Sequence, residues 1–294
     1  MPVKLISISM ENNQFFARVD GGPKFFVGKK VKYGDGFGLA NATFTATTPK
    51  YDPAQHRDKH GFWADFIFPT SQCESRGVFH CINSYDRARF TFSFLQYAAH
   101  VANGDFVKFF RKLLALNSAA DYFPDLTLKD NVIHRITETG LVRLEEGNPP
   151  LPLMNYLNPS LNEVEEIEAI NAAKFVHWAD NDPEHQRLQV EIGVRHFSEN
   201  MKLYSDRYGL NGRGDKVCLV VADIRHQGRA KSSVILAALN TGGDDEKAFK
   251  NLLEIGEEVY PGRIETLRKT INKSVAEGIL GKRKYDREKG EFVL

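Results

Sequence analysis

Residues 73–100 read CESRGVFHCINSYDRARFTFSFLQYAAH, and the predicted architecture rests mainly on these residues. One carboxylate, Glu74, precedes a polar loop, and a second, Asp86, follows twelve positions later. From Arg89 to Phe94 polar and aromatic residues alternate, which is typical of a short strand with two different faces. The stretch therefore predicts an α+β arrangement in which the two acids lie on different elements.

The composition excludes several classes of protein. The chain has 294 residues, enough for one large domain or two ordinary ones. Its 42% hydrophobic and 26% charged residues are normal for a globular protein. Because 39 Lys and Arg nearly balance 38 Asp and Glu, we expect no nucleic-acid partner, which would favour a clear basic excess.

The sequence shows neither a membrane span nor a leader. No apolar run approaches the roughly 18 residues that a bilayer requires. The start, MPVKLISISMENNQFF, has no long apolar stretch and no small-residue cleavage site. We expect synthesis in the cytoplasm without a signal peptide.

The three cysteines, Cys73, Cys81 and Cys218, are too few for a disulfide scaffold. Cys73 and Cys81 either form a bridge in an oxidising compartment or remain buried thiols. No Cys/His spacing resembles a zinc site. We therefore expect no metal and no other cofactor.

We divide the chain into a small β-rich module at 1–50, a main domain at 51–280 and a charged, frayed tail at 281–294. The motif GDGFG at 34–38 has neither a GxGxxG frame nor a following helix, so it predicts a turn. This argues against a doubly wound α/β fold. After residue 62 the chain reads as mainly helical, with a short β-element at 85–94.

The helical segments differ in how clearly they are marked. Residues 94–117 predict two helical pieces broken at Asn103-Gly104, with Asp105 as the N-cap of the second. Residues 161–210 predict one or two long helices, in which the acidic run at 163–168 forms a solvated first turn. The apolar run at 217–221 fits either a strand or a helix. Clear helical patterns follow at 244–260 and 263–280.

A family resemblance adds to this interpretation. A Glu at a helix end, a polar loop, an Asp and a Thr-containing β-segment ending in Gln resemble the lysozyme superfamily, which includes muramidases, lytic transglycosylases and chitosanases. Chitosanases look most similar around Asp86-Arg87-Ala88-Arg89-Phe90-Thr91 and Ser93-Phe94-Leu95-Gln96, and their C-terminal organisation is similar at 222–228. The resemblance covers roughly residues 60–270 and implies a mainly helical, two-lobed, lysozyme-like domain.

This sequence also departs from the chitosanase pattern. The loop between the acids looks shorter, and Ala88 and Ser93 stand where chitosanases carry glycines. Three arginines lie near the two acids: Arg76, Arg87 and Arg89. Such a site suits an anionic polymer better than cationic chitosan. Peptidoglycan has lactyl-peptide carboxylates, so it is the first choice of substrate, with chitosan as the alternative.

Hydrolysis of a β-1,4 linkage requires a proton donor to the leaving oxygen. Glu74 is the candidate general acid, because the apolar segment at 62–68 could desolvate it and keep it protonated near neutral pH. Arg76 would act in the opposite direction. The alternative is that Glu74 is an exposed residue at a helix end.

Asp86 is the candidate second carboxylate, and Thr91 would help it to hold the attacking water. Asp86 would activate this water and invert the anomeric centre if the carboxyl groups lie about 6.5–9.5 Å apart. The alternatives are that Asp86 caps a turn and that Thr91 belongs to an ordinary half-exposed strand. The residues predicted to bind substrate are Asn83, Tyr85, Arg89, Ser93, Gln96 and Gln227. We expect Asp223 and Arg225 to form a buried ion pair or hydrogen bonds that join helices.

The leading hypothesis is a muramidase-like glycoside hydrolase that degrades bacterial cell walls. Lacking a signal peptide, it would be a phage endolysin or an antibacterial toxin, acting in the periplasm or at the cell wall with a delivery or immunity protein as partner. A chitosanase is one alternative, and a lytic transglycosylase that needs only Glu74 is another. A non-catalytic phage or secretion protein that is structural or binds glycans is the alternative from another class.

Overall fold

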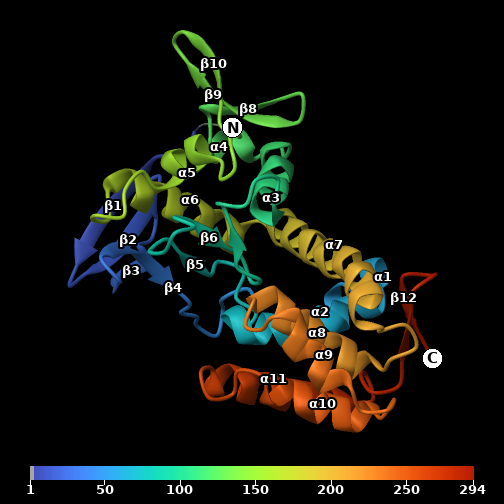
Figure 1. Ribbon diagram of the computed structural model, residues 1–294. Coiled ribbons are helices and arrows are strands. Elements are labelled where there is room, and N and C mark those ends of the chain that lie inside the picture. Colours follow the sequence, from blue (N-terminus) through green and yellow to red (C-terminus); the bar gives the residue numbers. More distant parts are fainter. Residues whose placement is uncertain (1–2) are drawn as a thin grey trace. The chain divides into compact units, whose positions relative to one another are not determined.

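The computed structural model describes residues 3–294 and has a mixed α+β fold with a β-rich N-terminal part, as expected (Figure 1). The chain forms two compact units. Unit 1 comprises the residues up to Lys50 together with Val78–Ile192, and unit 2 comprises Tyr51–Gly77 and Gly193–Leu294. Among residues 3–294, every helix is too short or too polar to span a lipid bilayer.

Unit 1 contains a seven-stranded antiparallel sheet whose strands follow one another in sequence order. The strands are β1 (Ile6–Glu11), β2 (Gln14–Val19), β3 (Phe25–Tyr33), β4 (Gly36–Asn41), β5 (Ile82–Asn83), β6 (Thr91–Phe92) and β7 (Tyr97–Ala98). Asn12 and Asn13 join β1 to β2 with positive φ angles of 51° and 62°, as a tight two-residue hairpin requires. Gly34 and Asp35 form the turn that the GDGFG motif predicts.

Two kinds of side chain fill the core of unit 1. On the sheet, Phe15, Ala17 and Val19 alternate inward, and helix α6 (Glu166–Asn181) lies alongside β1–β3 (Figure 1). In the β5–β7 region, aromatic rings pack against the middle of α6. This second group comprises Phe90, Phe92, Phe106, Phe110, Phe123 and Phe175. These phenylalanines are therefore core residues and not a surface for sugars.

The remaining elements of unit 1 are α3 (Asp105–Leu114), α4 (Ala119–Tyr122), α5 (Leu151–Leu157) and a three-stranded sheet of β8 (Leu126–Lys129), β9 (Val132–Thr137) and β10 (Gly140–Arg143). The helix predicted at 94–102 is wrong, because β7 pairs with β6 there instead. Asp105 is the first residue of α3 and not its N-cap, which is Gly104.

Unit 2 is mainly helical. Its helices are the 3₁₀ helix Pro53–Gln55, α1 (Arg57–His60), α2 (Phe62–Ser75), α8 (Asp215–Gln227), α9 (Ser232–Leu239), α10 (Asp245–Glu254) and α11 (Pro261–Ala276). α7 (Pro183–Tyr208) contributes its residues up to Ile192 to unit 1 and the others to unit 2. The run at 217–221 is helical, and α8 is buried over most of its length.

The C-terminal residues differ from the frayed tail that we expected. β11 (Lys284–Asp286) and β12 (Glu291–Val293) form a hairpin, and each carries one buried aromatic residue, Tyr285 and Phe292. Phe292 packs against Trp63 and Phe66 of α2. We predicted a frayed tail because charged residues separate these two aromatic residues in the sequence. The segment instead forms a short amphipathic hairpin. Of the predicted domain boundaries, only that at residue 50 coincides with a boundary between compact units, and independent folding of 1–50 stays a prediction.

Gly38 allows β4 to approach the loop that carries Asp86. A Cβ atom at Gly38 would lie 2.6 Å from backbone atoms of Ser84 and Tyr85, so Gly38→Ala should destabilise unit 1 by about 1–3 kcal/mol. Gly36→Ala is the matched control, since its Cβ would meet Leu161 at an ordinary 3.4 Å. Thermal unfolding of both variants measures the difference, and equal losses would contradict this role for Gly38.

Candidate functional site

Glu74 lies one residue before the end of α2. The helix stops because Arg76 adopts a left-handed conformation, with φ 58°, and its N–H group bonds to carbonyls of the last turn. The Glu74 side chain is 16% exposed. Its Oε1 lies 2.7 Å from Nη1 of Arg263 on α11 and 3.7 Å from Nε2 of His226 on α8. Glu74 therefore forms an ion pair with Arg263 inside unit 2.

Asp223 on α8 forms a second ion pair with the same arginine, Arg263. Its Oδ1 lies 2.7 Å from Nη2 of Arg263, and its Oδ2 lies 2.7 Å from Nη1 of Arg229. The side chains of Asp223 and Arg229 are completely buried. Burial alone would raise the pKa of Asp223, but the charges and hydrogen bonds of the two arginines outweigh it and lower that pKa. Asp223 is thus part of a buried ion-pair network, but the partner that we predicted, Arg225, is wrong: the partners are Arg229 and Arg263.

Two other titratable side chains border this ion-pair network. Burial lowers the pKa of His226, although the charge of Glu74 acts in the opposite direction. Burial also raises the pKa of the Cys73 thiol to about 12, so it is not a reactive thiolate. The described residues contain no disulfide, and Cys73 lies in unit 2 whereas Cys81 lies in unit 1.

Asp86 lies in the loop between β5 and β6 of unit 1. Its Oδ1 accepts a hydrogen bond from the Ala88 amide at 2.9 Å, and its carbonyl accepts one from the Arg89 amide at 2.9 Å. Asp86 therefore caps a turn, which was the alternative interpretation of Asn83-Ser84-Tyr85-Asp86. Capping engages one carboxylate oxygen and is compatible with a catalytic role.

A buried carboxyl group anchors the Asp86 loop. The Ser84 hydroxyl donates to Oε1 of Glu168 at 2.5 Å, and the Leu39 amide donates to the Ser84 oxygen at 2.7 Å. Asn158 donates to the carbonyls of Ser84 and Arg89. Glu168 is completely buried, and desolvation raises its pKa to about 7 despite the hydrogen bonds from Ser84 and Leu39. The solvated turn that we predicted at 163–168 is wrong at Glu168.

The other predicted site residues of β5–β7 are engaged with one another. Asn83 donates to Oε1 of Gln96 at 3.0 Å, and Gln96 donates to the carbonyl of Ser93 at 2.8 Å. The Ser93 hydroxyl accepts from the Leu95 amide. Thr91 is 6% exposed and Ser93 is completely buried, so the alternative of an ordinary half-exposed strand is wrong, because this strand is covered.

Three further predicted residues lie outside this group. Arg89 donates to Asn155 and to the Pro159 carbonyl. The ring of Tyr85 lies 5.6 Å from that of Tyr33. Gln227, in unit 2, accepts a hydrogen bond from Arg229. Glu74 and Gln227 thus belong to unit 2 and the other site residues to unit 1, and the pairing of Glu74 with Asp86 stays a prediction.

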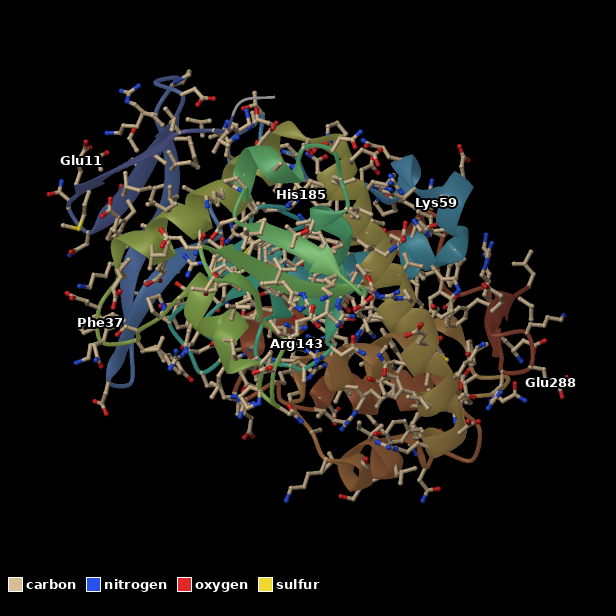
Figure 2. All side chains as sticks on the ribbon, turned by 90° about the horizontal axis from the view of Figure 1, so that it is seen from above. Glu11, Phe37, Lys59, Arg143, His185 and Glu288 are labelled. Carbon is tan, nitrogen blue, oxygen red and sulfur yellow. The ribbon has the colours of Figure 1, made fainter. Side chains whose placement is uncertain are left out.

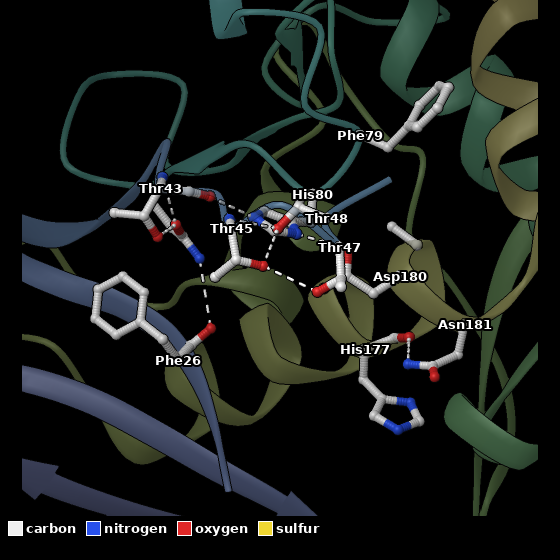
Figure 3. Close-up of polar contacts among 12 residues, drawn as sticks. Phe26, Thr43, Thr45, Thr47, Thr48, Phe79, His80, His177, Asp180 and Asn181 are labelled. Atoms are coloured by element: carbon white, nitrogen blue, oxygen red, sulfur yellow. Dashed lines mark hydrogen bonds and ion pairs between the residues drawn. The ribbon is translucent and has the colours of Figure 1, made fainter. Parts of the chain in front are cut away.

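Unit 1 contains a pocket with a volume of about 530 Å³, which we did not predict from the sequence; Figure 3 shows residues of its lining. It lies beside the loop that follows β4, the start of β3 and the last turn of α6. Its lining comprises Lys24, Phe25, Phe26, Thr43, Phe44, Thr45, Thr47, Thr48, Pro49, His80 and Asp180. The Thr-rich run at 43–48 belongs to the β-rich module that we predicted at 1–50, but it forms a loop after β4 and not a strand.

His80 connects two parts of the pocket lining, the end of α6 and the loop after β4. Its Nδ1 lies 2.6 Å from Oδ1 of Asp180, and its Nε2 lies 2.9 Å from the Thr43 carbonyl (Figure 3). The His80 residue is only 6% exposed. Because both ring nitrogens face oxygen acceptors of the protein, neither offers a lone pair to a bound molecule. His80 and Asp180 therefore shape the pocket and do not form a general-base pair.

A second buried histidine, His185, lies among aromatic rings. His185 on α7 is completely buried, and desolvation lowers its pKa to about 3, so it is neutral (Figure 2). Its Nδ1 lies 3.2 Å from Nε2 of Gln189, and the rings of Phe92 and Phe109 stand edge-to-face with the imidazole. Across residues 3–294, no group of three or more His, Cys, Asp or Glu side chains could hold a metal ion.

No protein-family model, no curated protein and no solved structure matches this chain.

Proposed function

We propose that the protein is a glycoside hydrolase that cleaves β-1,4 linkages of bacterial peptidoglycan, with Glu74 as general acid and Asp86 positioning or activating water. The observation that carries the proposal is the order of elements. Helix α2 ends directly after Glu74, and the chain continues into the antiparallel β5–β7 element with Asp86 in its first loop. This order supports the proposal because a Glu at a helix end, followed by an Asp beside a short β-element, is the order that the resemblance to the lysozyme superfamily implies.

The contacts of Glu74 define what catalysis would require. In the protein alone Glu74 is an acceptor for Arg263, so it acts as an acid only when substrate displaces Nη1 of Arg263 and the carboxyl takes up a proton. Arg263 would remain held through Nη2, which pairs with Asp223. Glu74 would then donate its proton to the leaving oxygen as the glycosidic bond breaks, while the Asp86 carboxylate takes a proton from the water that attacks the anomeric carbon.

The charges around Asp86 support peptidoglycan over chitosan. Arg87 is exposed and Arg89 is partly exposed in the Asp86 loop. A cationic loop attracts the carboxylates of peptidoglycan stems and repels the ammonium groups of chitosan.

A second candidate function is a non-catalytic glycan-binding or structural protein of a phage or secretion system. One observation favours it. The Glu74 carboxylate is already engaged by Arg263, and Thr91 and Ser93 are buried away from solvent.

Peptidoglycan clearing by purified full-length protein tests the proposal. We expect Glu74→Gln and Asp86→Asn each to lower the rate at least about 100-fold, since positioned acids and bases contribute factors of roughly 10²–10⁴. The matched controls are Glu254→Gln on α10 and Asp35→Asn in the β3–β4 turn, both exposed, and they should retain the wild-type rate. Melting temperatures of all variants show that the lost activity is not lost folding.

The other outcomes identify the alternatives. Turnover of chitosan alone would assign a chitosanase. Full activity of Asp86→Asn together with anhydro-sugar products in mass analysis would assign a lytic transglycosylase. A well-folded protein that is inactive on both polymers would contradict the proposal and favour the non-catalytic protein.

A further inference from the structure

The pocket beside His80 has the size and the fixed shape of a binding site. Its volume of about 530 Å³ falls within the roughly 300–1,000 Å³ that small-molecule sites occupy. The bonds of His80 to Asp180 and to Thr43 join α6 to the loop after β4. The site is therefore formed before any ligand arrives, which lowers the entropy cost of binding.

The charged side chains of the lining are each held by a partner in the protein. Nζ of Lys24 lies 2.6 Å from Oε1 of Glu11, and Oδ1 of Asp180 lies 2.6 Å from Nδ1 of His80. An anionic ligand would therefore find no unpaired ammonium group in this lining. The lining favours a neutral ligand over an anionic one.

The polar groups that remain are mainly hydroxyls. Thr45 and Thr47 are exposed, and their Oγ1 atoms lie 3.0 Å apart, with Thr48 next to Thr45 at 3.3 Å. A threonine hydroxyl both donates and accepts hydrogen bonds. A row of such groups matches a ligand that also carries neighbouring hydroxyls, each of which donates and accepts.

Aromatic side chains form the apolar part of the lining. Phe44 is 39% exposed, with Nζ of Lys50 3.3 Å from its ring centroid, and Phe25 and Phe26 are partly exposed. Rings combine a large apolar surface with a defined orientation, and such surfaces bury the C–H face of a saturated ring. Hydroxyls beside aromatic rings fit the hydroxyl groups and the C–H face of a pyranose.

We propose that this pocket binds a neutral saccharide of one or two pyranose rings. The inference is drawn from unit 1 alone and goes beyond the proposed hydrolysis, because none of its residues belongs to the Glu74 or Asp86 centres. Binding here would hold the protein on a glycan whether or not it cleaves one.

Calorimetric titration of the full-length protein with di-N-acetylchitobiose, a neutral disaccharide, tests this site. We expect Thr47→Val and Phe44→Ala each to weaken binding at least about tenfold, a loss of about 1.4 kcal/mol. Thr127→Val on β8 and Phe37→Ala on β4 are the matched controls in unit 1 and should bind as the wild type does. Phe37 is labelled on the sheet in Figure 2. Unchanged melting temperatures would show that the two pocket variants remain folded.

Three results would overturn the site. One is the absence of disaccharide binding at about 10 mM, where a Kd of about 1 mM would be readily seen. Another is binding of inorganic phosphate in place of the disaccharide. The third is disaccharide binding that Glu74→Gln or Asp86→Asn abolishes and that Thr47→Val and Phe44→Ala leave unchanged. Conversely, a protein that binds the disaccharide through Thr47 and Phe44 but clears no peptidoglycan would retain this site and lose the proposed hydrolysis.

Discussion

Replacing Asp223 by asparagine is expected to destabilise unit 2 by about 3–5 kcal/mol, the usual effect of removing one partner from a buried ion pair. Asp223 is completely buried and serves two guanidinium groups, those of Arg229 and Arg263, at 2.7 Å each. Asparagine can accept from only one of them, and its amide would face the other donor. The completely buried Arg229 would then lack a counter-charge.

The two tryptophans of the chain allow the unfolding of each unit to be followed separately. Trp63 lies in unit 2 and Trp178 in unit 1, and the chain has no other tryptophan. In a Trp178→Phe background, Trp63 fluorescence during urea unfolding reports on unit 2. Asp206→Asn is the matched control, because Asp206 also accepts two hydrogen bonds from an arginine, Arg287, but at an exposed position. It should leave the transition unchanged.

A second substitution separates loss of the ion pair from a simple packing defect. In Asp223→Asn, Arg229 should destabilise the protein because its charge has lost a partner. The double variant Asp223→Asn/Arg229→Met should therefore lose less free energy of unfolding than the sum of the losses in the two single variants. The pKa of Asp223 is lowered, so its stabilisation is complete above pH about 4 and is lost as the pH falls from there through the lower pKa of the folded state. Additive losses, or an Asp223→Asn loss no larger than that of Asp206→Asn, would contradict the network.

Local periodicity predicted much of the helical structure. The helices α6, α7, α10 and α11 lie where apolar residues recur at helical spacing. The four N-terminal strands likewise follow alternation and turn residues. Local sequence patterns gave a wrong prediction where tertiary contacts determine the secondary structure. Residues 94–102 have good helical residues, yet β7 pairs with β6 and the Tyr97 hydroxyl donates to the Gln189 carbonyl on α7.

The candidate site divides in the same way. Local sequence indicated Glu74 at a helix end and Asp86 in a turn, because both depend on neighbouring residues. Their partners could not be read locally. Arg263 contacts Glu74 although 189 positions separate them in the sequence, and Asp180 contacts His80 across a separation of 100 positions. No spacing rule connects such residues, and only the packing of α11 on α2 and of α6 on the sheet brings them together.

Glu168 is the other residue whose burial the sequence concealed, and it makes the stability of unit 1 depend on pH. Its pKa rises from an ordinary 4.5 to about 7 because the carboxyl is desolvated. A raised carboxyl pKa means that the folded state holds the proton more tightly than the unfolded state. Its contribution is therefore complete below pH about 4.5 and is lost as the pH rises towards 7, at a cost of about 3 kcal/mol.

Glu168→Gln should remove this dependence. Glutamine keeps an acceptor oxygen for Ser84 and Leu39 but carries no charge at any pH. We therefore expect the variant to resemble the wild type at pH 4.5 and to be more stable by about 3 kcal/mol above pH 7. Trp178 fluorescence in a Trp63→Phe background, followed in urea at several pH values, measures the difference in unit 1.

Glu166→Gln provides the control, because Glu166 lies on the same helix in an exposed position. It should leave the slope between pH 4.5 and 7 as in the wild type. If Glu168→Gln kept that slope, the buried carboxyl would not be its source.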